Sequence, residues 1–543
     1  MNILTRLLNR LRSQNSKPAK FASDRLDISE REQLVKQVKI SANLDKNIRL
    51  IQEAMGNSLD LEMVRFKAGP QQVPTVAFYM DGMVDNKDVE ILLRTLKIDI
   101  FVTGLKEVDS KGIFTTAREQ LVTAVEVESS NVLDQILSSI AYGSTVLLFQ
   151  DTADALLCAT RGWMARDITD PVGEIAIRAP KEGFVESLRT NTSLIRRRIH
   201  TPNLWMEGLI VGDLTRTEVG LVYIKGLAPE KIVGEVRSRI RGIKIDGILG
   251  SSYIEDFLQD QPLTIFPQVF STERPDRVAG ALLEGRVAVL TDGTPFALVV
   301  PNHLPAMIDA PDDYYEPFTL ALFLRLLRYS AFFISVFLPG IYVAIINFHP
   351  ELLPTVLFLR IAASREGIPF PAIVEAITIE LIFEVLREAG VRLPQAVGSA
   401  ISIVGALVLG DAAIKAGLVS PAMVIVVAMT AIASFTVPVF TLGIAARILR
   451  FGVIVLGGIF GMFGVQLALI LLMTHLCALR SFGLPYLYPL APLVTEDMKD
   501  TLFRSPWWAQ TRRPRLIGYR EPGRQPPGPR PGKRTGPRGE KRD

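Results

Sequence analysis

The distribution of charged residues limits what this chain can fold into more than any other feature of its sequence. Before Arg328 no long stretch lacks Asp, Glu, Lys and Arg. After it, four runs carry none of them: Tyr329–Pro350, Leu393–Gly410, Ala416–Ala446 and Phe451–Leu479. A charged side chain in hydrocarbon costs about 2.5–3.5 kcal/mol on insertion scales, and a helix needs about 20 residues to cross a bilayer. A soluble core could contain one such run, but four in one region predict an integral membrane domain.

The arginines that flank these runs indicate an orientation. Three pairs lie near the ends of expected spans: Arg325 and Arg328, Arg387 and Arg392, and Arg447 and Arg450. Cytoplasmic loops are enriched in Lys and Arg, so all three pairs are expected on the cytoplasmic side, which requires Ile368–Leu386 to cross or re-enter. With Phe451–Leu479 as the last long span, about four to six membrane segments are expected.

The soluble half contains an internal similarity. Thr75–Val84 (TVAFYMDGMV) resembles Val219–Ala228 (VGLVYIKGLA), and Gly143–Ala155 resembles Gly285–Ala297. In each half of the region, the first segment is followed by the second at nearly equal spacing. This arrangement predicts a duplicated subdomain, each copy with a strand, a helix and a late β-hairpin.

These patterns divide the chain into six parts. We expect a variable N-terminal helical region (1–70), a first soluble subdomain (71–176), a connecting helix (177–207), a second soluble subdomain (208–318), a membrane domain (319–495) and a basic tail (496–543). The predicted fold class is α+β, with two similar α/β-type soluble subdomains, followed by an α-helical polytopic membrane domain. The tail is rich in Arg, Pro and Gly, which predicts disorder and attraction to anionic membrane lipids; nucleic acid is not an expected partner.

Enzyme signatures are absent from the sequence. It contains no GxxxxGK[ST], HExxH or GxSxG motif, its four histidines are dispersed, and Cys158 and Cys477 lie far apart. Phosphate cradles, zinc sites and nucleophile elbows depend on such motifs. We therefore predict no catalytic site, no metal site and no cofactor.

One helical stretch of the membrane half concentrates charge. It runs from Glu375 to Glu388 (EAITIELIFEVLRE), and its candidate ion-pathway residues are Glu375, Glu380, Glu384, Arg387 and Glu388. The last four fall within an arc of about 100° on a helix. Carboxylates on one stripe of a membrane helix should face a bundle interior or water, where they attract cations. The spacings i,i+3 and i,i+4 equally fit ordinary ion pairs on a surface helix, so both interpretations stay open.

Two smaller features complete the candidate residues. Asp411 and Lys415 lie four residues apart in a polar hinge, where an ion pair that closes a helical hairpin is favoured over a proton relay. Gly457 and Gly461 form a GxxxG pair that allows close helix packing, either within one subunit or between subunits.

Several separated motifs occur along the chain in one order. They are TERPDRVAGALLEGRVAVLTDGTPF at 272–296, PDDYY at 311–315, FHPELLPT at 348–355, ASREGIPFP at 363–371, LREAGVRLP at 386–394, and the segments Ser402–Phe435 and Ser481–Pro492. Together they resemble the A subunits of spore germinant receptors, the GerA family. Asp411 departs from the glutamine that the family more often has there.

The resemblance implies a subunit of a nutrient receptor in the inner membrane of a bacterial endospore, with its soluble domain in the cytosol. It implies a transporter-like B subunit that binds germinant, a C-subunit lipoprotein, and a homo-oligomer that forms a ligand-gated cation channel. Two alternatives are a non-conducting scaffold or signalling subunit and a paralogous, germinant-independent spore ion channel. A secondary transporter is disfavoured because the membrane half has no inverted repeat that we can find.

Overall fold

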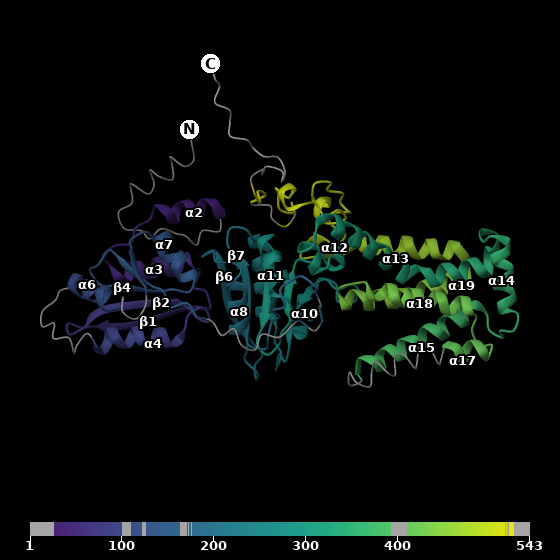
Figure 1. The fold of residues 1–543 in the computed structure, drawn as a ribbon, viewed down its shortest axis with the longest axis horizontal. Helices are drawn as coiled ribbons and strands as arrows, with labels where there is room; N and C mark the ends of the chain where they lie inside the picture. The colour runs from purple at the N-terminus through teal and green to yellow at the C-terminus, as the bar shows by residue number, and fades with distance from the viewer. Residues whose placement is uncertain are drawn as a thin grey trace, which may run out of the picture.

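The computed structural model describes residues 27–99, 110–121, 126–162, 171, 173–174, 176–392, 410–515, 517 and 521–525. The chain forms three bodies in a row: two α/β subdomains and a helical region (Figure 1). The predicted membrane run Leu393–Gly410 lies outside the described residues except for Gly410, so the number of membrane segments stays a prediction. Residues 1–26 of the predicted N-terminal region also lie outside them.

The first subdomain is a five-stranded antiparallel sheet with helices on both faces. Its strand order is β1-β2-β4-β5-β3, from β1 (Leu61–Ala68), β2 (Val73–Met80), β3 (Val127–Ser130), β4 (Thr145–Phe149) and β5 (Ala155–Cys158). Helices α2 (Ile28–Gln37), α3 (Leu44–Ala54) and α7 (Leu133–Ala141) cover one face, and α4 (Asn86–Arg94) and α6 (Ser110–Leu121) cover the other. Alternate side chains of β2 enter the two cores, with Phe78 in one and Ala77 in the other.

The second subdomain repeats this architecture. Its order is β6-β7-β9-β10-β8, from β6 (Leu204–Val211), β7 (Thr217–Ile224), β8 (Phe270–Thr272), β9 (Val287–Thr291) and β10 (Ala297–Val300). Helices α8 (Leu188–Arg196) and α11 (Pro275–Leu283) cover one face, and α9 (Glu230–Gly242) and α10 (Ser251–Leu258) the other. The predicted internal similarity is confirmed by this shared strand order.

The glycines that marked the repeat occupy equivalent turns. Gly82 and Gly226 follow β2 and β7 with φ values of 78° and 86°, and Gly143 and Gly285 follow α7 and α11 with φ values of 89° and 95°. Only glycine adopts this left-handed region at no steric cost, so the turn geometry explains why the same residue stands at both positions.

Each subdomain begins earlier than the sequence indicated. Strand β1 starts at Leu61, inside the predicted N-terminal region 1–70, and β6 starts at Leu204, inside the predicted connecting segment 177–207. Both are edge strands of their sheets. Seven of the eight residues of β1 are exposed or only partly buried, so this strand lacks the continuous buried run that marks β4 and β9.

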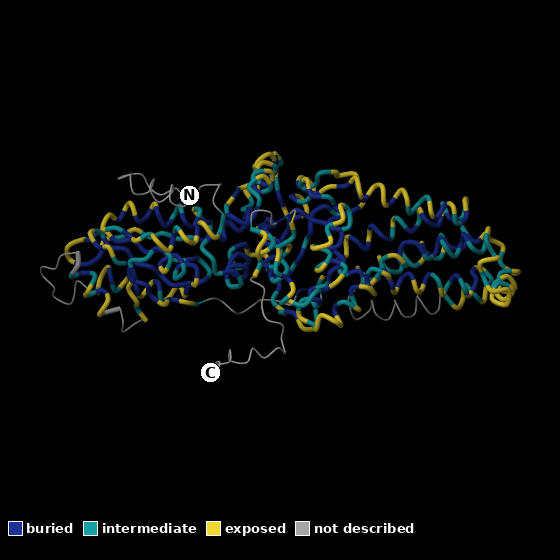
Figure 2. Tube along the Cα trace, turned by 90° about the horizontal axis from the view of Figure 1, so that it is seen from above, coloured by how far each residue is buried: buried dark blue, intermediate teal, exposed yellow. Residues whose placement is uncertain are grey.

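The helical region follows a short junction made of α12 (Leu304–Ile308) and the 3₁₀ turn η2 (Pro311–Tyr314). Its elements are α13 (Phe318–Phe348), the turn η3 (Pro350–Leu352), α14 (Thr355–Arg365), α15 (Ala372–Arg392), α17 (Gly410–Lys415), α18 (Pro421–Phe435) and α19 (Phe440–Ala478). By length and composition α13 can cross a membrane, and so can the residues of α19 taken as one continuous run; α18 is a shorter apolar helix. The segment around α14, at the end far from the subdomains, is largely exposed (Figure 2).

Helix α19 reverses direction at Gly461, whose φ of 63° and ψ of −145° are not helical. A Cβ placed on Gly464 would lie 1.9 Å from the carbonyl oxygen of Leu456, although residues eight apart on a straight helix are about 12 Å apart. Residues 440–460 and 462–478 are therefore two antiparallel arms of about 31 and 25 Å. The run Phe451–Leu479, expected as one span, is divided between them because one glycine permits the turn.

After the second arm the chain returns to the second subdomain. His475 lies 2.9 Å from the hydroxyl of Thr264, and the Tyr486 hydroxyl donates to the carbonyl of Pro267 at 2.9 Å. The elements that follow are β11 (Arg480–Ser481), β12 (Leu484–Pro485) and the 3₁₀ turns η5 (Asp497–Asp500) and η6 (Trp507–Ala509).

The first part of the predicted disordered tail differs from that expectation, because residues 496–515 pack against the junction. Arg504 is buried: its side chain lies over the rings of Tyr314 and Trp507, and its Nε donates to the carbonyl of Asp313. Aromatic stacking and backbone acceptors thus fix an arginine that composition alone assigned to a solvated tail. Residues 526–543 lie outside the described part of the chain.

Candidate functional site

The five predicted ion-pathway residues lie on α15, and the structure divides them by their surroundings. Glu375 is buried at the end of the helix far from the subdomains. Its Oε1 accepts hydrogen bonds from the backbone N and the hydroxyl of Ser420, at 2.7 and 2.5 Å, and Arg365 lies 3.2 Å from its Oε2. This carboxylate therefore ties α15 to α14 and to the N-terminus of α18.

Glu380 forms a second buried contact, one turn further along. Its Oε2 lies 2.6 Å from Nη1 of Arg450, and both side chains are at most 2% exposed. The Nε of Arg450 also donates to the carbonyl of Ser335 at 2.7 Å. A buried ion pair is tolerated only when its geometry and additional hydrogen bonds offset desolvation, and here those bonds join α15, α19 and α13.

Glu384 and Arg387 form a third contact near the subdomain end of α15. Glu384 lies 2.5 Å from Arg447 and 3.2 Å from Arg387. Arg387 also donates to the Ser434 hydroxyl at 3.2 Å, and its guanidinium packs on the ring of Phe435. Glu388, the fifth residue, is exposed and pairs only with the exposed Arg392 among the described residues.

The outward face of α15 is therefore different from the face that sequence reasoning selected. Besides Ile382, its exposed side chains recur at alternating intervals of four and three residues, and they are Val374, Thr378, Leu381, Val385, Glu388 and Arg392. We call this set the α15 stripe. Such spacing places side chains on one seam of a helix, and the stripe leaves an apolar seam with a carboxylate near its subdomain end.

Sequence reasoning missed this division because the arginine partners are distant in the chain. Arg365, Arg447 and Arg450 come from α14 and α19, and they turn Glu375, Glu380 and Glu384 toward the bundle. The signal that could have found it was the presence of three arginines inside or beside apolar runs, since such residues need partners.

The hinge and glycine candidates are placed as follows. Asp411 and Lys415 form an exposed pair on α17, with 2.6 Å between Oδ2 and Nζ. A Cβ on Gly457 would lie 2.6 Å from the carbonyl oxygen of Gly340, so α19 and α13 approach closely within one chain. Gly461 instead makes the turn between the arms of α19.

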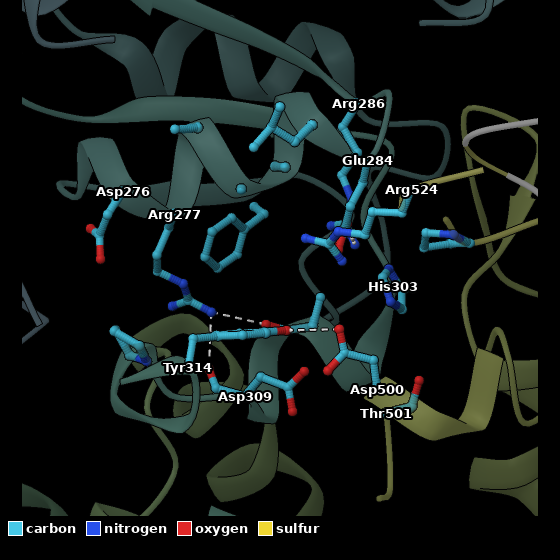
Figure 3. A pocket seen from close by; sticks show the side chains of 18 of the residues that line it. Asp276, Arg277, Glu284, Arg286, His303, Asp309, Tyr314, Asp500, Thr501 and Arg524 are labelled. Carbon is cyan, nitrogen blue, oxygen red and sulfur yellow. Dashed lines mark hydrogen bonds and ion pairs between the residues drawn. The ribbon is translucent and has the colours of Figure 1, made fainter. Parts of the chain in front are cut away.

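A second site, which the sequence did not predict, is a pocket of about 470 Å³ at the junction. We call it the junction pocket. Figure 3 shows it between α11, α12, η2 and the C-terminal segment. Apolar residues line part of its wall: Phe270, Ala279, Ala281, Leu283, Ala306 and Pro311.

One side of the junction pocket carries basic groups. Arg286 is buried, and its Nη2 lies 3.1 Å from Glu284, while its Nε has no hydrogen-bond partner within the described part of the chain. His303 beside it is buried too, and its Nδ1 is likewise without a partner there. Burial and the nearby Arg286 hold the pKa of His303 well below its ordinary value, so its imidazole is neutral.

Acidic groups lie on the other side of the junction pocket. The Tyr314 hydroxyl donates to Oδ2 of Asp500 at 3.5 Å, and Asp309 lies next to them (Figure 3). Burial raises the pKa of Asp309 to about 7 and that of Asp500 to about 6. Taking these carboxyls out of water disfavours their charged forms, although nearby arginines act in the opposite direction.

The acidic side continues into the start of α13. Nε of Arg325 lies 3.0 Å from Asp309 and 3.2 Å from Asp313, and its Nη1 donates to the carbonyls of Asp500 and Thr501 at 2.7 and 3.0 Å. Arg328 also donates to Asp313, which gives both arginines a carboxylate partner. We call Arg325, Arg328, Asp309, Asp313 and Asp500 the junction cluster. It joins the second subdomain, the first long helix and the C-terminal segment.

The described residues contain no group of His, Cys, Asp or Glu side chains arranged to hold a metal ion. These sites can bind ligands and place charges. The helical region holds carboxylates paired with arginines, and the junction between this region and the second subdomain holds a pocket with both signs of charge.

Comparisons with known proteins agree with the resemblance seen in the motifs. A family model described as "Bacillus/Clostridium GerA spore germination protein" matches residues 49–516. The chain is 44% identical over 496 residues to spore germination protein KA of Bacillus subtilis (strain 168), covering 91% of this chain and 90% of that protein. It is 36% identical to spore germination protein GerLA of Bacillus cereus, covering 87% and 95%.

A solved structure also matches. The N-terminal domain of the A subunit of the Bacillus megaterium spore germinant receptor GerK3 is 35% identical, with a TM-score of 0.40, and the match covers 49% of this chain and 98% of that one. The family model extends over both subdomains and the helical region. The chain belongs to the GerA family of spore germination proteins.

Proposed function

We propose that this chain is the A subunit of a spore germinant receptor and that several copies form a cation channel in the spore inner membrane. Family membership supports the receptor role. The apolar α13 and α19 support insertion in a membrane. The single observation that carries the channel proposal is the α15 stripe, which is not covered by the described residues of one chain.

The α15 stripe has the properties of a pathway lining. Leu381 and Val385 are 57% and 62% exposed, and Thr378 and Glu388 add polar groups on the same seam. Around an oligomer axis, rings of Leu381 and Val385 would form a hydrophobic constriction that closes by dewetting. A ring of Glu388 at the mouth would concentrate cations.

The other predicted pathway residues take a supporting role in this proposal. Glu375, Glu380, Glu384 and Arg387 hold α15 against its neighbours through ion pairs, so their charges are compensated in the closed bundle. Because Arg450 also bonds to Ser335 of α13, a shift of α13 would be transmitted to α15. Glu388 keeps the role of attracting cations, because its pair with Arg392 is exposed to solvent and therefore weak.

The expected orientation and partners belong to the same proposal. The junction cluster and Arg447 lie at the subdomain end of the helices, which the positive-inside rule assigns to the cytosol. The chain's proposed partners are the transporter-like B subunit and the C-subunit lipoprotein that the resemblance implies.

Potassium efflux from proteoliposomes that contain the chain with its B and C partners tests the proposal. Leu381→Ser should raise efflux without germinant, because a hydroxyl ring wets the constriction, and Glu388→Gln should lower cation selectivity. Ile432→Ser is the matched control, since Ile432 is 67% exposed on α18 outside the α15 stripe. Equal leak from both serine variants would contradict the assignment of α15.

A non-conducting scaffold is the competing proposal, and the pairing of Glu375, Glu380 and Glu384 with arginines favours it. The same assay separates the two. A scaffold predicts no efflux from any reconstituted combination, together with a monomeric mass in detergent. A germinant-independent channel predicts efflux from the chain without B and C partners.

A further inference from the structure

The junction pocket lies apart from the α15 stripe, and none of its lining residues belongs to that stripe. It opens between α11, α12, η2 and the C-terminal segment rather than between the two subdomains (Figure 3). Ligand pockets of about 300–1,000 Å³ hold small organic molecules, and this one measures about 470 Å³. Its size therefore suits a small solute or a small headgroup.

The basic side of the junction pocket offers polar groups that the protein leaves unused: a guanidinium donor, and an imidazole nitrogen that donates in the tautomer carrying its proton on Nδ1. Arg286 is 6% exposed and its Nε lacks a hydrogen-bond partner among the described residues, as does Nδ1 of the 7%-exposed His303. Leaving a buried polar group unsatisfied costs about 1–3 kcal/mol. An anionic group placed beside them would recover part of that cost, with Arg524 contributing a further positive charge from the C-terminal segment.

The acidic side offers an acceptor in the same way. Oδ1 of Asp500 has no hydrogen bond within the described chain, and the arginine nitrogens nearest to it, of Arg504 and Arg325, lie 3.8 and 4.0 Å away. An ammonium group can therefore approach this oxygen closely. The Tyr314 hydroxyl already bonds to the other oxygen of Asp500, which fixes the orientation of the carboxylate.

The two signs of charge restrict the ligand. A simple anion would meet Glu284 and Asp500, and a simple cation would meet Arg277 and Arg286. The wall also contains apolar residues, Phe270 and Leu283 among them. A molecule with both charges on a short apolar body satisfies all three surfaces.

We propose that the junction pocket binds a small zwitterion, with its anionic group at Arg286 and His303 and its ammonium group at Asp500. Binding acts on the first long helix, because the carbonyls of Asp500 and Thr501 hold Arg325 of α13. Two sources have this chemistry: a free amino acid and the headgroup of phosphatidylethanolamine. The proposal does not depend on channel activity, since it is tested by binding alone.

The test is calorimetric titration of the full chain in phosphatidylglycerol nanodiscs. One arm uses L-leucine with 4-methylpentanoate, which lacks the ammonium group, and 3-methylbutylamine, which lacks the carboxylate. The other arm uses glycerophosphoethanolamine. Arg286→Gln and Asp500→Asn change the two sides of the junction pocket. Arg65→Gln and Asp45→Asn are matched controls in an exposed pair of the first subdomain, and thermal unfolding checks that each variant folds.

We expect one of the zwitterions to bind saturably, with both half-analogues at least tenfold weaker. Each pocket variant should lower the affinity at least tenfold and each control should leave it unchanged. Binding of L-leucine identifies a free solute as the source, and binding of glycerophosphoethanolamine alone identifies the headgroup. The proposal is overturned if neither zwitterion binds, if a half-analogue binds equally well, or if a folded pocket variant keeps the wild-type affinity.

Discussion

The two soluble subdomains have the same strand order but different relations to the rest of the molecule. The second shares one hydrophobic core with the helical region, in which Leu304 and Met307 of the junction join Val336, Leu476 and Tyr486. The first has cores of its own. The second subdomain is thus fixed to the helices, and we call it the base. The first is attached through the second, and we call it the module.

The contact between the two subdomains is chemically different from the contact with the helices. It includes hydrogen bonds and a buried ion pair, such as the Leu59 amide donating to the Met206 carbonyl at 2.7 Å and Arg196 to Asp60 at 2.9 Å, with only local apolar packing by Ile28 and Leu59. Apolar burial stabilises at about 25 cal/mol per Å² whatever the exact geometry, whereas a buried ion pair adds little net stability but demands one arrangement. The module should therefore detach more readily than the base.

The largest effect is expected from Arg325→Gln in the junction cluster. Arg325 is fully buried between Asp309 and Asp313 and donates to two carbonyls, so its removal leaves Asp309 without its ion-pair partner and those carbonyls without their donor. Removing one partner of a buried pair costs about 3–5 kcal/mol. Denaturant titration in detergent micelles measures the free energy of unfolding of the second subdomain and helices together.

Arg360→Gln is the control for this prediction, because Arg360 is exposed on α14. Its free energy of unfolding should stay within about 0.5 kcal/mol of wild type. A similar loss in the two variants would show that the junction cluster does not join the base to the helices.

Arg196→Gln should act on the contact between the two subdomains, because Arg196 of α8 reaches Asp60 of the first subdomain. It leaves Asp60 buried without its guanidinium partner, at a cost of about 3 kcal/mol at the lower end of the range for buried pairs. Hydrogen exchange should then accelerate in β1 and α8 while α13 keeps its protection. Arg197→Gln, which removes a partly exposed partner of Glu182, is the control. Equal loss of protection in α13 would mean that the two subdomains unfold as one unit.

A smaller effect is expected from pH. The pKa of Asp309 is about 7, raised by burial above its ordinary value, so the folded state binds more protons than the unfolded state between about pH 4 and 7. The charged groups that face Asp309 are Arg325 and Arg328 on α13, Asp313 on η2 and Asp500 in the C-terminal segment. Its contribution is present at low pH and is lost as pH rises through 7.

Stability of the base should therefore fall by about 1–2 kcal/mol from this group between pH 5 and 7. Asp309→Asn should remove this contribution to the pH dependence of the free energy of unfolding, because an amide does not titrate. Unfolding curves at several pH values measure it, with Asp312→Asn as a nearby control. An unchanged slope in Asp309→Asn would show that the carboxyl is ionised across this range.

The smallest effect is expected at the exposed hinge. Asp411→Asn breaks the pair with Lys415, but both side chains are more than half exposed. Exposed helical pairs of this spacing contribute about 0.3–0.5 kcal/mol. A thermal shift above that of Lys87→Gln, an exposed substitution in the first subdomain, would indicate a role beyond an ordinary surface pair.

The sequence predicted features that depend on local chemistry. Gly82 and Gly226 revealed the repeat because their turns need the same backbone conformation. The charge-free runs indicated apolar helices because hydrocarbon excludes charge along any single helix, and α13 and α19 fit that expectation.

Features that depend on distant partners were not predictable in this way. Glu380 faces inward because Arg450 meets it from another helix, and Arg504 is buried because Tyr314 and Trp507 stack on it. The turn at Gly461 could not be distinguished from ordinary close packing of a GxxxG pair. The junction pocket is assembled from segments separated by most of the second half of the chain.

The most direct test of the central claim is potassium efflux from proteoliposomes that carry the chain with its B and C partners. The account predicts efflux that Leu381→Ser raises and Ile432→Ser leaves unchanged, because only the first lies on the α15 stripe. Absence of efflux from assembled complexes, with Leu381→Ser indistinguishable from wild type, would contradict it.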